Sequence, residues 1–237
     1  MIVERKVYHL DKVDWRVAFK PWPFADAHAA QIEEYWLEAS ARNPYIFNGG
    51  VFVMQNHKVE AGVFYGQFVP ADFASYLYWR DRGFDDWPTC DGYAAIFLRG
   101  QRGDYFLAKA ADHTLNGGMH VPPGGLIDAR DITSSGMVDI SGYVLRELEE
   151  ETGLTRADVI LEDGYLVVRI GCIVVLAVRA RCVKHDDEII ERVKNHHLRQ
   201  NRPELEECLW YRGDETTAVQ AHTKLLIGYM QNFCDLQ

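Results

Sequence analysis

The sequence predicts a mixed α/β (α+β) protein built from two units. Short runs rich in β-branched and aromatic residues alternate with stretches whose apolar residues recur at helical spacing. The length of 237 residues exceeds one minimal domain. Residues 83–92, GFDDWPTCDG, collect Gly, Pro and Asp between regular segments and mark the joint. We therefore predict a small α+β N-terminal unit over residues 1–88 and a larger domain over residues 89–237.

The N-terminal unit is predicted to contain two helices and a hairpin. Apolar and aromatic side chains line one side of a helix over residues 25–41, which Asn43-Pro44 ends. So small a unit buries little surface alone, and we expect it to pack on the larger domain. Its other predicted elements are strands over residues 51–55 and 59–69 with a turn at 56–58, and a helix over residues 71–82.

The larger domain is predicted to interleave strands with helices. A glycine-rich stretch over residues 116–125 leads into a helix over residues 141–152, for which Asp139 and Ser141 are candidate N-caps. The other predicted elements are strands over residues 93–99 and 105–110 around a turn at 100–104, β-rich sequence at 160–163 and 166–180 with a bend at Gly171, a helix at 188–200, a strand at 207–211 and a helix at 218–233.

The run RELEEETGL, residues 146–154, says most about chemistry. In a helix, Glu147, Glu150 and Glu151 project from one face, and Gly153 is the expected helix stop. Carboxylates in the last turns are unfavourable because they repel one another and meet the negative end of the helix dipole. A hard divalent cation such as Mg2+ would offset both costs, so the run predicts a metal site.

The same run resembles the second half of the Nudix box, the signature of hydrolases that split nucleoside diphosphates linked to another moiety. Pro122-Pro123-Gly124-Gly125 supplies the glycine corner that opens such a box. Arg146 can bridge to Glu150 one turn further on and orient it. Every fixed position of the second half is matched, by Arg146, Glu147, Leu148, Glu150, Glu151, Gly153 and Leu154.

The first half of the box departs from the family pattern. Gly125 lies about seven positions too far upstream of Arg146, so residues are inserted between them. The acid that the pattern places upstream of the Arg falls on Val138 by strict count. Asp128 and Asp139 are the nearest acids that can substitute for it, and both stay open.

The resemblance implies an α/β/α sandwich with a mixed sheet and a pyrophosphohydrolase that acts on acid anhydrides. His113 and His120 flank the glycine-rich loop and are candidates for phosphate contact. The general base stays open among Glu151, Glu188, Glu206 and Glu207. The implied site residues are Glu147, Glu150 and Glu151 for Mg2+ or Mn2+, Glu150, Glu151 and Arg146 for catalysis, and Gly124, Gly125 and His120 for substrate.

The expected substrate is a small nucleoside diphosphate derivative. A nucleotide sugar is preferred, because the N-terminal unit leading into an interrupted box resembles sugar-nucleotide Nudix hydrolases; ADP-ribose-like and dinucleotide substrates stay open. The alternative is a Nudix-fold nucleotide-binding or sensing module without turnover. The retained acids argue against that alternative, and the missing upstream Glu argues for it. Family members are often dimers, which leaves a homodimer open.

Composition restricts the partners and the compartment. The net charge of -10 argues against a nucleic-acid polymer, since phosphate backbones demand clustered Lys and Arg. The five cysteines show no Cys-x-x-Cys spacing, which favours a reduced, cytoplasmic protein. The N-terminal residues lack an apolar signal core, and no apolar run approaches the length of a membrane span. We therefore expect neither secretion nor membrane insertion.

Two further features are given their simpler interpretation, and a third stays open. Pro21-Trp22-Pro23-Phe24 is similar to a motif of NADH-cleaving Nudix enzymes, but it precedes the box instead of following it, so coincidence is preferred. His196-His197 has no Cys or His partner at ligand spacing and is predicted to be a surface pair. Residues 43–49, NPYIFNG, form either a cap over a base or sugar, or a buried turn.

Overall fold

A mixed sheet forms the centre of the protein, whose computed structural model describes residues 2–86, 88–213 and 216–234. Within those ranges the sheet has seven strands in the order β1-β8-β9-β5-β6-β10, with β7 paired to β6. β5 and β9 run parallel and the other neighbours antiparallel. The strands are β1 (Tyr8–Leu10), β5 (Asp91–Arg99), β6 (Tyr105–Ala110), β7 (His120–Val121), β8 (Val159–Ile170), β9 (Ile173–Cys182) and β10 (Leu205–Tyr211).

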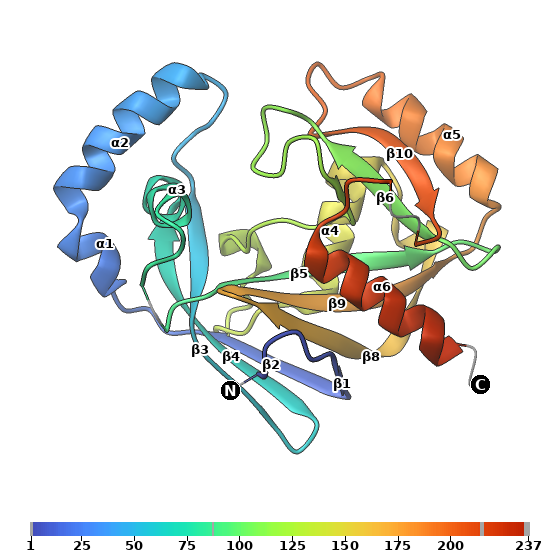
Figure 1. The fold of residues 1–237 in the computed structure, drawn as a ribbon, viewed down its shortest axis with the longest axis horizontal. Coiled ribbons are helices and arrows are strands. Elements are labelled where there is room, and N and C mark those ends of the chain that lie inside the picture. The colour runs from blue at the N-terminus through green and yellow to red at the C-terminus, as the bar shows by residue number, and fades with distance from the viewer. Residues whose placement is uncertain (1, 87, 214–215, 235–237) are drawn as a thin grey trace.

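Helices cover both faces of this sheet (Figure 1). α4 (Ile140–Thr152) and α5 (Asp186–His197) share a buried core with Ile96, whereas α6 (Ala221–Cys234) packs with Phe97 on the opposite face. These neighbours on β5 point to opposite sides because side chains alternate along a strand. The expected α/β/α sandwich with a mixed sheet is confirmed. None of the helices in the described ranges is long and apolar enough to cross a lipid bilayer.

A second, three-stranded sheet belongs to the N-terminal part of the chain, in the order β2-β4-β3 (Figure 1). The helix predicted over residues 25–41 is present but broken at His28, whose backbone leaves the helical region at φ -117° and ψ 16°. It ends at Arg42, before Asn43-Pro44 as predicted. The elements are β2 (Lys12–Val17), α1 (Pro23–Ala27), α2 (Ala29–Arg42), β3 (Gly50–Glu60), β4 (Val63–Asp72) and α3 (Phe73–Asp81).

The hairpin turn predicted at residues 56–58 is wrong. Those residues stay extended and pair with residues 65–67 of β4, and the chain reverses instead at Ala61 and Gly62. Both have positive φ, 49° and 74°, as a tight two-residue hairpin turn requires. The polar residues 56–58 suggested a turn at that place. The pairing of β3 with β4 and the left-handed conformations of Ala61 and Gly62 set the turn a few residues further on.

The N-terminal part and the larger domain are packed together. β1 pairs with β8 and so forms an edge of the larger sheet. Trp15 and Phe64 lie in the same buried cluster as Ile96 and Val144 of the larger domain. The expected packing of the two parts is therefore confirmed, while the division after residue 88 stays a prediction.

The predicted elements of the larger domain are present, with ends shifted by a few residues. β5 and β6 flank the predicted turn at 100–104, and Gly171 lies at the predicted bend between β8 and β9 with φ 59°. The last helix begins at Ala221 instead of residue 218. Such shifts are typical of sequence-based boundaries, because end residues are decided by capping and pairing.

Candidate active site

The acid-bearing helix α4 begins and ends where the sequence predicts. The Asp139 side chain caps it by accepting the backbone N–H of Gly142 at 3.0 Å. Gly153 ends it in the left-handed conformation, φ 69°, and its N–H donates to the carbonyl of Glu149 at 2.9 Å. Because both caps are local, they place Glu147 and Glu151 in the closing turns.

A glycine corner lies directly over this end of α4. The Ile96 N–H donates to the Pro123 carbonyl at 2.9 Å, which inserts the corner beside β5. A Cβ on Gly124 would stand 2.7 Å from the Ala94 carbonyl oxygen, and one on Gly125 would stand 2.7 Å from Glu147 Oε2. The two glycines therefore allow backbone to approach both the strand and the acids.

Glu147 and Glu151 are carboxylates held in an unfavourable environment. Burial raises the pKa of Glu147 to about 7, with Arg146 opposing and Glu150 adding to the rise. Burial, and next the charge of Glu147, raise the pKa of Glu151 well above its usual range. The Gly124 N–H opposes this by donating to Glu151 Oε2 at 3.1 Å. Two carboxylates that disfavour their own ionisation are suited to a cation.

Glu150 lies differently from its two neighbours. It is exposed, and its carboxylate accepts from Arg130 Nη1 and Arg146 Nη1, both at 2.9 Å. The predicted bridge from Arg146 to Glu150 is thus confirmed. Among the residues that the structure describes, no three His, Cys, Asp or Glu side chains are already arranged around one metal position. Oxygen ligands of Glu147 and Glu151 fit Mg2+ in kind, and Glu150 would have to leave its arginines to join them.

Arg146 is anchored by an acid that the sequence analysis did not identify. Its Nε and Nη2 donate to Asp131 Oδ1 at 3.0 and 2.9 Å, and Nη2 also donates to Asp131 Oδ2 at 2.9 Å. Arg146 Nη2 lies 2.9 Å from Glu147 Oε1 as well. Asp131 is only 3% exposed and lies in the inserted segment. The sequence feature that could have identified Asp131 is its spacing of three residues from Asp128, because the two acids form a capping box around Ala129–Asp131.

The three positions considered for the upstream acid have other roles. Val138 is buried in the apolar core. Asp139 is the cap of α4, and Asp128 caps the short helix Ala129–Asp131 while pairing with Arg130 Nη2 at 2.6 Å. The inserted residues add a turn to the chain before α4. The acid that reaches Arg146 is therefore Asp131, and its position cannot be found by counting residues back along the family pattern.

Glu204 is a second residue that the sequence analysis missed. Its charge raises the pKa of both Glu147 and Glu151, so it lies within electrostatic range of both. It immediately precedes β10, where the Ala111 N–H donates to its carbonyl at 2.9 Å. No motif marked it, since its proximity depends on strand pairing. Of the bases considered, Glu188 pairs with Lys184, whereas Glu206 and Glu207 are exposed on β10.

The expectation of a surface His196-His197 pair is wrong for His197, which is 8% exposed. Its Nε2 lies 2.9 Å from the Glu151 carbonyl oxygen and its Nδ1 lies 3.0 Å from that of Glu206. His196 Nε2 lies 3.1 Å from the Glu150 carbonyl oxygen. α5 thus supplies hydrogen-bond partners for the last carbonyls of α4, which no helical N–H can reach.

Replacing His197 with Ala is expected to destabilise the protein by about 1–3 kcal/mol, because buried carbonyls lose their partner. Chemical denaturation followed by circular dichroism measures the change. His185→Ala is the matched control, since His185 is exposed and makes no capping hydrogen bond at the start of α5. Equal unfolding midpoints for the two variants would show that the His197 contacts contribute nothing.

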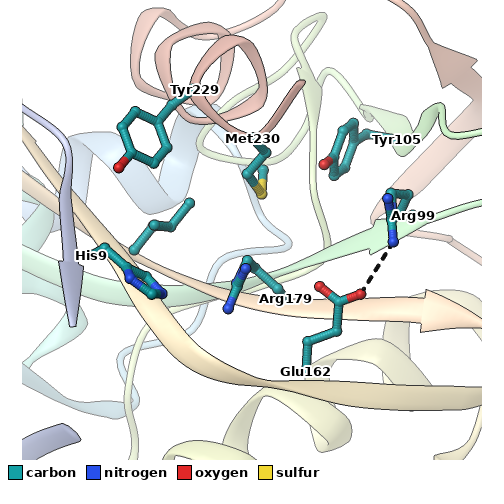
Figure 2. Close-up of a pocket in the computed structure, with 8 residues that line it drawn as sticks. His9, Arg99, Tyr105, Glu162, Arg179, Tyr229 and Met230 are labelled. Carbon is teal, nitrogen blue, oxygen red and sulfur yellow. Dashed lines mark hydrogen bonds and ion pairs between the residues drawn. The ribbon is translucent and has the colours of Figure 1, made fainter. Parts of the chain in front are cut away.

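His120 lies on the other face of the sheet from the acids. It is opposite Lys109 in the β6–β7 pair, and Lys109 alternates in phase with Leu107, which packs under α6. A hollow on the same α6 face is lined by Arg99, Glu162 and Arg179, among others (Figure 2). His120 and this hollow therefore lie outside the site assembled around α4.

Comparison with known proteins adds similarities of structure. No family model and no curated protein matches this chain. A C. elegans Ap4A hydrolase binary complex is 17% identical, with 61% of this chain and 99% of that chain covered and a TM-score of 0.46. The chain is similar to solved Nudix hydrolases. MutT protein from Methanosarcina mazei Go1 is 18% identical, covering 60% of this chain and 93% of that one, with a TM-score of 0.42. The NUDIX domain of Shewanella oneidensis NrtR complexed with ADP ribose is 14% identical, covering 68% and 98%, with a TM-score of 0.39.

Proposed function

We propose that this chain is a Nudix-type pyrophosphohydrolase that needs Mg2+ or Mn2+ and cleaves the diphosphate of a nucleoside diphosphate derivative. The observation that carries the proposal is the pair of carboxylates Glu147 and Glu151, whose pKa values burial raises, beneath the backbone of Gly124 and Gly125. In a purely structural helix, burying two acids against each other only costs stability. In a site for a cation and a diphosphate, the same two acids serve as ligands of the cation.

In this proposal each residue of the site has a distinct task. Glu147 and Glu151 hold the metal, with Glu150 as the third ligand. When bound, the metal neutralises phosphate charge and lowers the pKa of its water. Arg146 is a positioning residue, because it bridges Asp131, Glu147 and Glu150. Gly124 and Gly125 let the diphosphate lie against the backbone.

The general base is proposed to be Glu151 or Glu204. Burial raises the pKa of Glu151, which makes its carboxylate a stronger base. The charge of Glu204 acts on Glu147, and the exposed side chain of Glu204 is open to solvent and substrate. The pH profile of Glu204→Gln distinguishes the two. It loses the rise in rate with pH if Glu204 is the base and keeps that rise if Glu151 is the base.

The test is a phosphate-release screen coupled to a phosphatase. It covers nucleotide sugars, which we place first, then ADP-ribose, dinucleotides and nucleoside triphosphates, each with Mg2+, Mn2+ or a chelator. We expect metal-dependent turnover of one group, abolished in Glu151→Gln and retained in the exposed control Glu149→Gln. Turnover that persists in the chelator would contradict the proposal.

A nucleotide-binding module without turnover is the second candidate. It is favoured by the pairing of Glu150 with Arg130 and Arg146, which keeps the three acids from a common metal position. Such a module would be stabilised by a nucleotide in a thermal shift assay and would release no phosphate under any metal. Arg130→Ala removes one of the two arginines that hold Glu150, and it should raise turnover in an enzyme and leave a binding module without turnover.

A further inference from the structure

Two aromatic rings stand out on the loop between α2 and β3. Tyr45 is 65% exposed and Phe47 is 79% exposed, so the interpretation of this loop as a buried turn is wrong. Apolar surface left uncovered in this way is available to a ligand or a partner. Their surroundings decide what they bind.

The loop is held at both ends. Asn43 Nδ2 donates to the His113 carbonyl at 3.0 Å, while its Oδ1 accepts the Tyr45 N–H at 3.2 Å. At the other end, Asn48 Oδ1 accepts the Ala74 N–H at 2.7 Å. The Phe47 ring lies so close to Gly49 that a Cβ there would meet it at 2.7 Å. The rings are therefore presented on a fixed support.

Arg202 connects this loop to the site. Its guanidinium carbon lies 3.0 Å from the centre of the Tyr45 ring. Its Nη1 is buried and has no hydrogen-bond partner among the residues that the structure describes. An arginine that stacks on an aromatic ring while one buried N–H group lacks an acceptor is suited to an anion.

The position of Arg202 ties these rings to the acids of α4. Arg202 lies four residues before Glu206. His197 joins this segment to the end of α4, since its Nδ1 lies 3.0 Å from the Glu206 carbonyl oxygen and its Nε2 lies 2.9 Å from that of Glu151. The backbone N–H of Ala111 holds the Glu204 carbonyl, and the loop that follows Ala111 also accepts from Asn43. The segments that carry Tyr45 and Arg202 are therefore tied to the closing turn of α4, which carries Glu151.

We propose that Tyr45, Phe47 and Arg202 bind the nucleoside end of the substrate. The heterocyclic base stacks on the two rings, and Arg202 donates to the phosphate next to the ribose. This inference rests on the proposed function for the position of the diphosphate. It assigns to the N-terminal part of the chain the task of selecting nucleotides over pyrophosphate alone.

The experiment measures affinities of UDP, ADP and inorganic pyrophosphate for the full chain by calorimetry, with Mg2+ and with chelator. Tyr45→Ala should weaken nucleotide binding by about 5- to 150-fold, as loss of a base–aromatic stack does, and leave pyrophosphate affinity unchanged. Tyr45→Phe keeps the ring and should bind like the unchanged chain. Arg202→Lys keeps the charge, loses the planar stack and should weaken nucleotide binding.

Leu37→Ala is the control, since Leu37 is exposed on α2 and belongs neither to the proposed nucleoside subsite nor to the site around α4. Nucleotide affinity unchanged in both Tyr45→Ala and Phe47→Ala would overturn the inference, as would a loss of self-association in those variants without any change in nucleotide affinity. Absence of nucleotide binding in the unchanged chain would overturn it too. Circular dichroism melting confirms that each variant is folded.

The same data separate this inference from the proposed function. Binding of UDP or ADP that depends on Tyr45, without metal-dependent turnover of any substrate, would keep the subsite and remove the hydrolase. Turnover that Glu151→Gln abolishes and Tyr45→Ala leaves unchanged in KM would keep the hydrolase and remove the subsite.

Discussion

Glu151→Gln is expected to lower metal-dependent turnover by a factor of about 100 to 10,000. The same change is expected to make the metal-free protein more resistant to heat. Glu151 is a carboxyl whose pKa burial and the charge of Glu147 raise well above its usual range. A neutral amide of the same shape removes that repulsion and still accepts the Gly124 N–H. Loss of activity with gain of stability is the signature of a functional acid.

The pH dependence of stability follows from the same shifts. A carboxyl whose pKa is higher in the folded than in the unfolded protein makes its full contribution to stability below the unfolded pKa. This contribution is lost as the pH rises through the folded pKa. For Glu147 this loss runs from about 4.5 to about 7, and at pH 8 it amounts to about 3 kcal/mol at most. Unfolding midpoints of the unchanged chain should therefore fall over this range, and those of Glu147→Gln should fall less.

Added Mg2+ distinguishes a functional acid from a merely strained one. It should raise the melting temperature of the unchanged chain at pH 8 and have little effect on Glu151→Gln, because binding to the folded state stabilises it. Glu149→Gln, on the exposed side of α4, should behave as the unchanged chain in both assays. A Glu151→Gln protein that melts at a lower temperature than the unchanged chain would contradict this account.

Asp131→Asn is expected to destabilise the protein by about 3 kcal/mol and to lower turnover as well. Asp131 accepts three hydrogen bonds from Arg146 and is 3% exposed. Burial raises the pKa of Asp131, and Arg146 opposes the rise. Removing one partner of a buried pair leaves the other charge uncompensated, at a cost of about 3–5 kcal/mol. Arg146 keeps Glu147 and Glu150, which places the cost at the low end.

Urea unfolding of Asp131→Asn, Arg146→Gln and the double variant measures this pair directly. The double variant should cost less than the sum of the two single changes, because they remove one shared interaction. Asp26→Asn is the control, since Asp26 is exposed on α1. Additive effects of the two changes would show that Asp131 and Arg146 act independently, and would remove Asp131 from the positioning of the acids.

The sequence by itself determined the features that depend on near neighbours along the chain. The limits of α4 were predictable because Asp139 and Gly153 act on N–H and carbonyl groups within a turn of themselves. The shared face of Glu147, Glu150 and Glu151 followed from helical periodicity alone. The order of strands and helices followed from the alternation of apolar patterns, whereas the α/β/α class was implied by the resemblance to the Nudix box.

Only the tertiary structure decided which distant groups meet at the site. Asp131 reaches Arg146 across an insertion, Glu204 joins the acids through the pairing of β10 with β6, and His197 closes α4 from α5. Arg202 meets Tyr45 from the far end of the chain. Helical periodicity and capping act over about one turn, whereas these contacts depend on strand register and helix packing between residues far apart in sequence.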